Sequence, residues 1–149
     1  MILKKELLSI PLWGWYLAKS DVIAIDRSSK KAAIESIKQG ALRIKEQGRP
    51  IVIFPQGTRV APDVSADKKP YKVGVARVQD ATGLPIIPMA MNAGVFWGRN
   101  AFWKSSGTVI FEFLPPIAPG METSELLKTL EGGIEERSTA LMDEARDNG

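Results

Sequence analysis

Ile51-Val52-Ile53-Phe54-Pro55-Gln56-Gly57-Thr58-Arg59 is the stretch on which the fold prediction rests, because an apolar run gives way there to residues that turn the chain and bind anions. The run from Ile51 to Phe54 predicts a buried strand, since consecutive apolar residues bounded by turn residues are typical of one. Pro55 ends such a strand because it has no N–H to donate. The polar residues that follow are therefore expected just past a strand end, where open α/β sheets bind ligands.

The polar part of this stretch has the chemistry of an anion site. Gly57 allows a turn geometry that a side chain would resist. Arg59 offers a planar fork of five N–H donors, which suits a phosphate or a carboxylate. An ordinary strand exit with a solvated arginine explains the same residues equally well, since surface arginines are common.

A second run repeats this order of residues. Val22 to Ile25 is a short apolar stretch that predicts a strand, and Asp26 and Arg27 follow it directly. Two strands that each end in an arginine can bring both guanidinium groups to one anion. The alternative is a local ion pair between Asp26 and Arg27, which stabilises by only ~0–1 kcal/mol when exposed.

Helical and strand patterns alternate along the rest of the chain. Lys30 to Gln47 is amphipathic, with Ser28 or Ser29 as the expected N-cap and Gly48 just past the end. This alternation predicts an α/β fold with a mixed, largely parallel sheet flanked by helices, in a single domain of residues 1–149. The further elements expected are a helix from Lys72 to Thr82, strands at Leu84–Met91 and Thr108–Leu114, and a closing helix from Thr123 or Ser124 to about Ala145.

Composition excludes several classes of function. The chain of 149 residues has 44% hydrophobic residues, a net charge of +3, no cysteine and no histidine. It therefore has no disulfide, no cysteine nucleophile and no expected metal site. A mild basic excess suits an anionic substrate or membrane surface, and no nucleic-acid motif is present. No apolar stretch is long enough to span a bilayer and no signal peptide is visible, so we expect a cytoplasmic location, either soluble or peripheral on the cytoplasmic face of a membrane.

Two groups of aromatic residues have two interpretations. Packing against the sheet is the simpler one for both groups. Contact with an acyl chain or a membrane interface is the other, because amphipathic aromatics favour that boundary. The groups are Trp13, Trp15 and Tyr16 in the first, and Phe96, Trp97, Phe102 and Trp103 in the second.

Four segments in order resemble the motifs of the glycerolipid acyltransferases, and together they extend from about Leu3 to Pro119. Phe54–Arg59 is similar to that family's Phe-Pro-Glu-Gly-Thr-Arg motif. Ile23–Arg27 is similar to its upstream phosphate-binding block, which ends in Asp-Arg. The other two are Leu84–Met89, similar to its proline-framed apolar strand, and Lys4–Tyr16, similar to the segment before the Asp-Arg block.

The resemblance is strongest to the 1-acylglycerol-3-phosphate acyltransferases, and it implies a reaction and a site. A fatty acyl group passes from acyl-CoA or acyl-carrier protein to the free hydroxyl of lysophosphatidate, giving phosphatidate, with no bound cofactor. Gln56 stands where most of the family has Glu, so we expect it to position the glycerol and not to act as a carboxylate. The residues that the resemblance implies for the substrate phosphate are Arg27, Arg59, Lys72, Gly57 and Thr58.

One block of the family is missing from this sequence. The family's first motif is His-x-x-x-x-Asp, whose histidine is the general base, and this chain has no histidine. A general base contributes about 10²–10⁴-fold. We therefore expect an N-terminally incomplete acyltransferase with no catalytic residue in this chain, inactive alone. The alternative is a non-catalytic module that binds lysophospholipids or acyl groups.

Overall fold

The computed structural model describes residues 2–4, 8–20, 23–25, 29–58, 60, 69–98 and 102–147. The chain divides into two compact units. Unit 1 consists of Met1–Pro55 and Val73–Leu84, and unit 2 consists of Gln56–Lys72 and Pro85–Gly149. Each unit has its own two-stranded sheet and its own long amphipathic helix.

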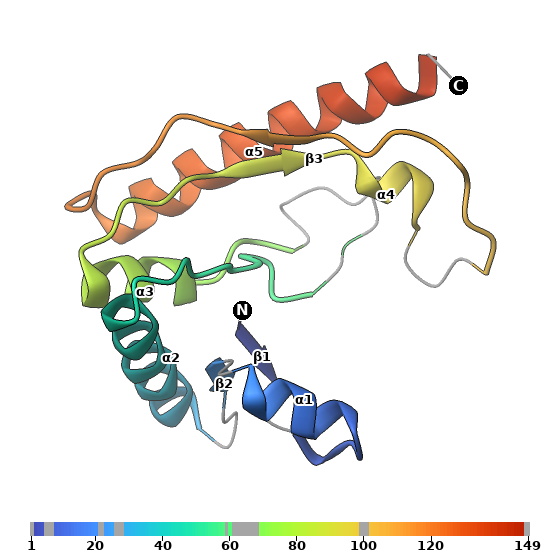
Figure 1. Cartoon of the computed structure of the whole chain (residues 1–149). Coiled ribbons are helices and arrows are strands. Elements are labelled where there is room, and N and C mark those ends of the chain that lie inside the picture. Colours follow the sequence, from blue (N-terminus) through green and yellow to red (C-terminus); the bar gives the residue numbers. More distant parts are fainter. Residues whose placement is uncertain are drawn as a thin grey trace. The chain divides into compact units, whose positions relative to one another are not determined.

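Unit 1 contains a two-stranded parallel ribbon and helices (Figure 1). Ile2, Leu3 and Lys4 pair with Ile23, Ala24 and Ile25. The unit packs helix α2 against both strand β2 and helix α3. Its elements are β1 (Ile2–Lys4), α1 (Trp13–Lys19), β2 (Ile23–Ile25), α2 (Lys30–Glu46) and α3 (Gly74–Thr82).

Helix α2 forms where the sequence predicts it. The Ser29 hydroxyl accepts a hydrogen bond from the Ala32 N–H at 3.0 Å, which satisfies one of the free donors of the first turn. The last turn ends at Gly48, whose φ of 64° is the left-handed conformation that glycine adopts at low cost. The core of unit 1 consists of Ile23, Ile37, Ala41, Ile44 and Val78.

The predicted strand from Ile51 to Phe54 is wrong. Ile51 and Ile53 pack against the core of unit 1, whereas Val52 and Phe54 are 48% and 57% exposed. In the described part of the chain this run joins neither sheet, because β1 and β2 form a two-stranded ribbon on their own. An apolar run becomes a strand only where a neighbouring strand completes its backbone hydrogen bonds.

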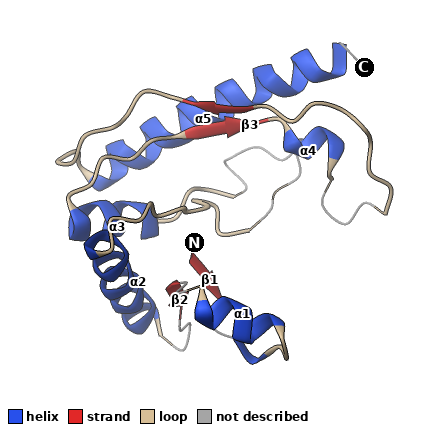
Figure 2. Ribbon diagram, in the orientation of Figure 1, coloured by secondary structure: helices blue, strands red, loops and turns tan. Residues whose placement is uncertain are grey.

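Unit 2 contains an antiparallel ribbon and the longest helix (Figure 2). Met89, Ala90 and Met91 pair with Phe113, Glu112 and Phe111, and an isolated bridge joins Ile86 to Ile117. Ala90, Leu126, Leu130 and Leu141 are buried where α5 packs against β3. The elements are β3 (Met89–Met91), α4 (Ala93–Phe96), β4 (Phe111–Phe113) and α5 (Thr123–Asp147).

The two long helices are confirmed, and the sheet is only partly as predicted. The prediction of a largely parallel sheet is not confirmed, because the described residues have one parallel and one antiparallel ribbon. Strand β4 also exposes Phe111 and Phe113, while Glu112 is half-buried. Glu112 accepts from the Arg137 Nε–H at 2.9 Å, which explains why the acidic residue faces α5.

Core packing is the wrong interpretation for most of the aromatic residues. Trp13, Trp15 and Tyr16 are more than half exposed on α1. In unit 2, Phe102 and Trp103 are 87% and 84% exposed and meet edge-to-face at 5.2 Å. Within the second group Trp97 is exposed as well, and the centre of its ring lies 5.2 Å from Lys104 Nζ.

Candidate functional site

The turn Gln56-Gly57-Thr58 belongs to unit 2 and follows the end of the apolar run. Gly57 has a φ of 68°, so the turn uses a conformation that other residues adopt only with strain. Gly57 and Thr58 are exposed, and Gln56 is half-buried. The turn is therefore at the surface of unit 2.

Lys72 lies directly against this turn. A Cβ placed on Gly57 would be 3.0 Å from Lys72 Nζ and 3.4 Å from its Cδ. The lysine is exposed, so its ammonium group is a positive charge at the surface of the turn. The structure thus brings together three predicted phosphate ligands, Gly57, Thr58 and Lys72, although Lys72 is 14 positions from Thr58 (72 minus 58).

A hydrogen-bonded cluster supports the turn from helix α5. Glu135 Oε1 accepts from the Tyr71 hydroxyl at 2.9 Å and from Gln56 Nε2 at 3.4 Å. Glu131, one helical turn earlier, accepts from the Tyr71 N–H at 3.3 Å. Both ends of Tyr71 are therefore held by carboxylates of the same helix.

Tyr71 is only 7% exposed, and its surroundings oppose ionisation. Burial raises the pKa of the Tyr71 hydroxyl far above its ordinary value of 10.0, and the hydrogen bond to Glu135 and the negative charges of Glu135 and Glu131 add to this. The hydroxyl therefore stays protonated and remains a hydrogen-bond donor throughout the physiological range.

The two predicted arginine ligands, Arg27 and Arg59, lie outside the described residues. Their convergence on one anion stays a prediction. Gln56 is described, and its amide donates to Glu135, so it is held in place by α5.

The sequence did not indicate Tyr71, Glu131 or Glu135. No predicted element contains Tyr71, and no motif singles out the acidic residues of the closing helix. A spacing of four places Glu131 and Glu135 on one face of the helix, but the same spacing is common on solvated helices. The one available signal was that Tyr71 directly precedes the candidate ligand Lys72.

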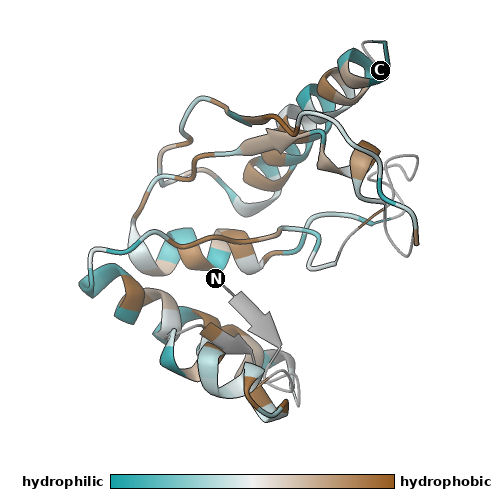
Figure 3. Cartoon of the chain, turned by 45° about the vertical axis from the view of Figure 1, so that its right-hand side comes forward, coloured by the Kyte–Doolittle hydropathy of each residue, from teal (hydrophilic) through white to brown (hydrophobic). Residues whose placement is uncertain are grey.

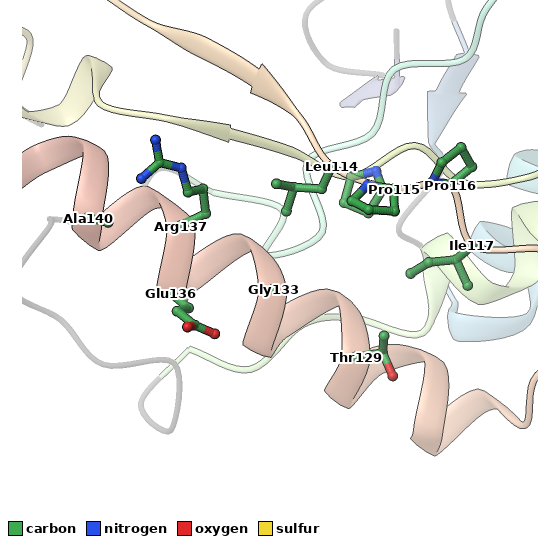
Figure 4. Close-up of a pocket in the computed structure, with 10 residues that line it drawn as sticks. Leu114, Pro115, Pro116, Ile117, Thr129, Gly133, Glu136, Arg137 and Ala140 are labelled. Carbon is green, nitrogen blue, oxygen red and sulfur yellow. The ribbon is translucent and has the colours of Figure 1, made fainter.

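Unit 2 also has an open groove, with a volume of about 570 Å³, along helix α5 (Figure 4). One side is the segment after β4, where Leu114, Pro115 and Pro116 face the helix. Gly133 leaves room on the other side, because a Cβ there would be 3.7 Å from Leu114 Cδ1. Of the candidate ligands within the described residues, namely Gln56, Gly57, Thr58 and Lys72, none lines this groove.

Comparison with known proteins identifies the fold and the family. The acyltransferase family profile matches residues 1–92, which include the Gln56-Gly57-Thr58 turn and Lys72. This chain belongs to the acyltransferase family. A 1-acyl-sn-glycerol-3-phosphate acyltransferase of Pseudomonas aeruginosa is 39% identical over 108 residues, which are 72% of this chain and 41% of that acyltransferase.

Other acyltransferases agree with this assignment. The 1-acyl-sn-glycerol-3-phosphate acyltransferase of Cocos nucifera is 32% identical over 117 residues, which are 78% of this chain and 37% of its own length. The crystal structure of the 1-acyl-sn-glycerophosphate acyltransferase PlsC from Thermotoga maritima has a TM-score of 0.69 at 23% identity. It covers 94% of this acyltransferase chain and 55% of PlsC, so the fold is shared. The chain spans about two fifths of the curated relatives' length.

No helix in the described part of the chain combines the length and the apolar character needed to cross a bilayer.

Proposed function

We propose that the protein to which this chain belongs acylates lysophosphatidate to phosphatidate, with acyl-CoA or acyl-carrier protein as the donor. The observation that carries this proposal is the Gln56-Gly57-Thr58 turn with Lys72 Nζ against it, in a chain of the acyltransferase family. The curated relatives from Pseudomonas aeruginosa and Cocos nucifera are named for this reaction.

The chemistry of the turn suits the acceptor. Lysophosphatidate has a phosphate, a free hydroxyl and an apolar tail, so its binding requires a fixed positive charge close to accessible backbone N–H groups. Lys72 supplies the positive charge, and the exposed residues Gly57 and Thr58 supply the backbone N–H groups. Arg27 and Arg59 are further phosphate ligands in this proposal. Holding the acceptor in one orientation lowers the barrier to attack on the acyl donor.

The role of this chain within the reaction is acceptor binding. It has no histidine, so the family's histidine general base is not among its residues. We propose that the chain alone binds lysophosphatidate and that turnover requires a His-x-x-x-x-Asp block. No covalent enzyme intermediate is needed, because the acceptor hydroxyl attacks the thioester carbon directly while the base takes its proton. The C–S bond of the donor then breaks, and the thiolate of CoA or of the acyl-carrier protein leaves and takes up a proton to become the free thiol.

We also propose that the protein works at the surface of a membrane. Its substrates are lipids, and both units carry exposed aromatic side chains of the kind that lie at the membrane interface. Lys104 lies over the Trp97 ring at 5.2 Å, which places a cation beside one of these aromatics and suits anionic headgroups.

Two measurements on the 149-residue chain test the proposed function. The first is binding of a short-chain lysophosphatidate beside inorganic phosphate by calorimetry, where we expect tighter binding of the lipid. The second is transfer from acyl-CoA to lysophosphatidate by the chain alone and by a version extended with a His-x-x-x-x-Asp block, where we expect only the extended version to turn over.

The outcomes separate the alternatives. Binding of lysophosphatidate without turnover in either version would favour a non-catalytic binding module. Equal affinity for phosphate and lysophosphatidate would overturn the assignment of a lipid substrate. Full activity of the short chain would show that another residue acts as the base.

A further inference from the structure

Glu135 occupies an unexpected position for an acidic residue near a phosphate site. It lies on α5, 79 positions after Gln56, and one of its oxygens accepts from both Gln56 and Tyr71. A carboxylate that repels a phosphate is unfavourable there unless its charge performs another function. The geometry of the cluster indicates what that function is.

The amide at position 56 suits the acidic residue that it contacts. Gln56 Nε2 is 3.4 Å from Glu135 Oε1, and an amide can donate to a carboxylate at this distance. A glutamate at position 56 would instead place two carboxylates face to face, and one of them would have to become protonated or turn away. Gln56 is thus matched to Glu135.

The acidic residue beside this turn differs in position from the one in the motif that the turn resembles. That motif has its acid within the turn, whereas this chain has an amide in the turn and an acid on α5 beside it. The pair contains one amide and one carboxylate in contact. A carboxylate therefore lies next to the turn although position 56 carries an amide.

The same cluster fixes the position of Lys72 through the preceding residue, Tyr71. Glu135 holds the Tyr71 hydroxyl at 2.9 Å, and Glu131 holds the Tyr71 N–H at 3.3 Å. Because Tyr71 is buried and held at both ends, the next residue begins from a fixed backbone. Lys72 Nζ is then kept against Gly57, within reach of an anion bound at the turn.

We propose that Glu135 is the positioning residue of the site: it replaces the acid that the turn lacks at position 56, and it orients Gln56 and Tyr71 so that Lys72 faces the bound phosphate. This inference rests on the proposed function, because lysophosphatidate is the ligand whose binding it controls. In this role Glu135 acts through Gln56 and Tyr71.

A charge swap tests this inference on the 149-residue chain. The variants are Gln56→Glu, Glu135→Gln and the double variant that carries both, and the measurement is the dissociation constant for short-chain lysophosphatidate. We expect Gln56→Glu to bind about tenfold more weakly, because two carboxylates then face each other. We expect the double variant to recover to within about threefold of the parent chain, because the pair again has one amide and one acid.

Glu136→Gln is the matched control. Glu136 is the next residue of α5 and is exposed, and the cluster around Tyr71 does not include it. We expect Glu136→Gln alone to change the affinity by less than about twofold, and Gln56→Glu with Glu136→Gln to stay as weak as Gln56→Glu. Urea unfolding of each variant shows whether it is folded. If Gln56→Glu does not fold, the double variant with Glu135→Gln still tests the inference, because it again has one amide and one acid at these two positions.

Several outcomes would overturn the inference. If the swap binds as weakly as Gln56→Glu, the effect of position 56 does not pass through Glu135 and a different partner, such as Arg59, becomes the better explanation. If Glu136→Gln rescues equally, only net charge matters. If the parent chain does not bind lysophosphatidate, the proposed function is wrong as well, whereas binding by the parent without rescue contradicts the positioning role alone.

Discussion

Helix α2 of unit 1 and helix α5 of unit 2 place polar side chains at the same spacing and use them differently. In α2, Gln39 Nε2 donates to Glu35 Oε1 at 2.9 Å, so the pair satisfies itself on the helix surface. In α5, Glu131 and Glu135 accept instead from Tyr71, which lies 60 and 64 positions away in the sequence. A spacing of four therefore does not indicate whether a polar face is solvated or supports a site.

Glycines in the two helices also differ in their surroundings. A Cβ on Gly40 of α2 would be 2.6 Å from Ile23 Cγ2, because the helix lies directly on strand β2. A Cβ on Gly132 of α5 would meet nothing within 4 Å. Both helices show alternating polar and apolar stripes (Figure 3), so hydropathy alone does not distinguish the two glycines.

The helix N-termini differ in chemistry. Ser29 accepts from the Ala32 N–H with a neutral hydroxyl. Glu122, the residue before α5, accepts from the Ser124 N–H at 2.7 Å and from the Ser124 hydroxyl. The Ser124 hydroxyl, followed by the Ser124 N–H, holds the pKa of Glu122 below its ordinary value of 4.5.

The largest expected effect concerns the buried face that both helices have. We expect Leu130→Ala in α5 and Ile44→Ala in α2 each to lower the free energy of unfolding by about 2–5 kcal/mol, because both side chains are only 2% exposed. Urea unfolding measures the change. A loss below about 1 kcal/mol in either variant would contradict the assignment of that side chain to a core.

The glycine pair gives the next largest effect, with opposite signs in the two helices. We expect Gly40→Ala to destabilise by about 1–3 kcal/mol, since Ile23 must shift to admit the methyl group. Gly132→Ala is the matched control, and we expect it to stabilise by about 0.5–1 kcal/mol, because alanine loses less backbone entropy in a helix. Thermal unfolding followed by circular dichroism compares them, and equal signs would break the comparison.

The third prediction uses Tyr71 against Gln39. We expect Tyr71→Phe to cost about 1 kcal/mol, because it removes a buried hydrogen bond to Glu135. Gln39→Ala should cost only about 0.2–0.5 kcal/mol, since it removes an exposed pair within one helix. Equal costs in urea unfolding would show that the α5 pair is as weakly coupled to the fold as the α2 pair.

The last comparison concerns the two helix N-termini, whose contributions to stability differ in their dependence on pH. We expect Ser29→Ala to cost about 1 kcal/mol at every pH, because a hydroxyl does not titrate in this range.

The contribution of Glu122 is expected to depend on pH. Its pKa is lower in the folded than in the unfolded chain, so it stabilises fully above its ordinary value of 4.5 and loses that effect as the pH falls through the folded-state pKa. Glu122→Gln should therefore destabilise near pH 7 and have little effect in acid, as measured by urea unfolding at a series of pH values. A loss that does not change with pH would contradict this assignment.

Parts of the fold and site that depend on short-range patterns were predictable. Amphipathic periodicity and a capping serine predicted α2 to within one residue of Glu46, and the periodicity of the closing helix predicted α5. The Gly57 turn and Lys72 were predicted from the residues of the turn and the family resemblance, and the structure brings them together. These features depend on interactions within a few residues or on the chemistry of single side chains.

Other predictions failed because they depend on distant partners. Ile51–Phe54 has the apolar character of a strand but no strand beside it in the described residues, so it stays outside both ribbons. In the predicted strand at Thr108–Leu114, Phe111 and Phe113 are exposed, and Glu112 faces α5 because Arg137 is there to bind it. Phe102 and Trp103 are likewise exposed where core packing was expected.

By itself, the sequence determined the long helices, the serine cap and glycine end of α2, the glycine turn, the acyltransferase resemblance and the lack of histidine in this chain. Only the tertiary structure decided that Glu135 meets Gln56 and Tyr71, which are 79 and 64 positions away. Helix formation is fixed by hydrogen bonds and side-chain spacing within a few residues. The partner of a surface carboxylate, in contrast, is whichever donor the fold brings within about 3 Å, and no local pattern specifies that donor.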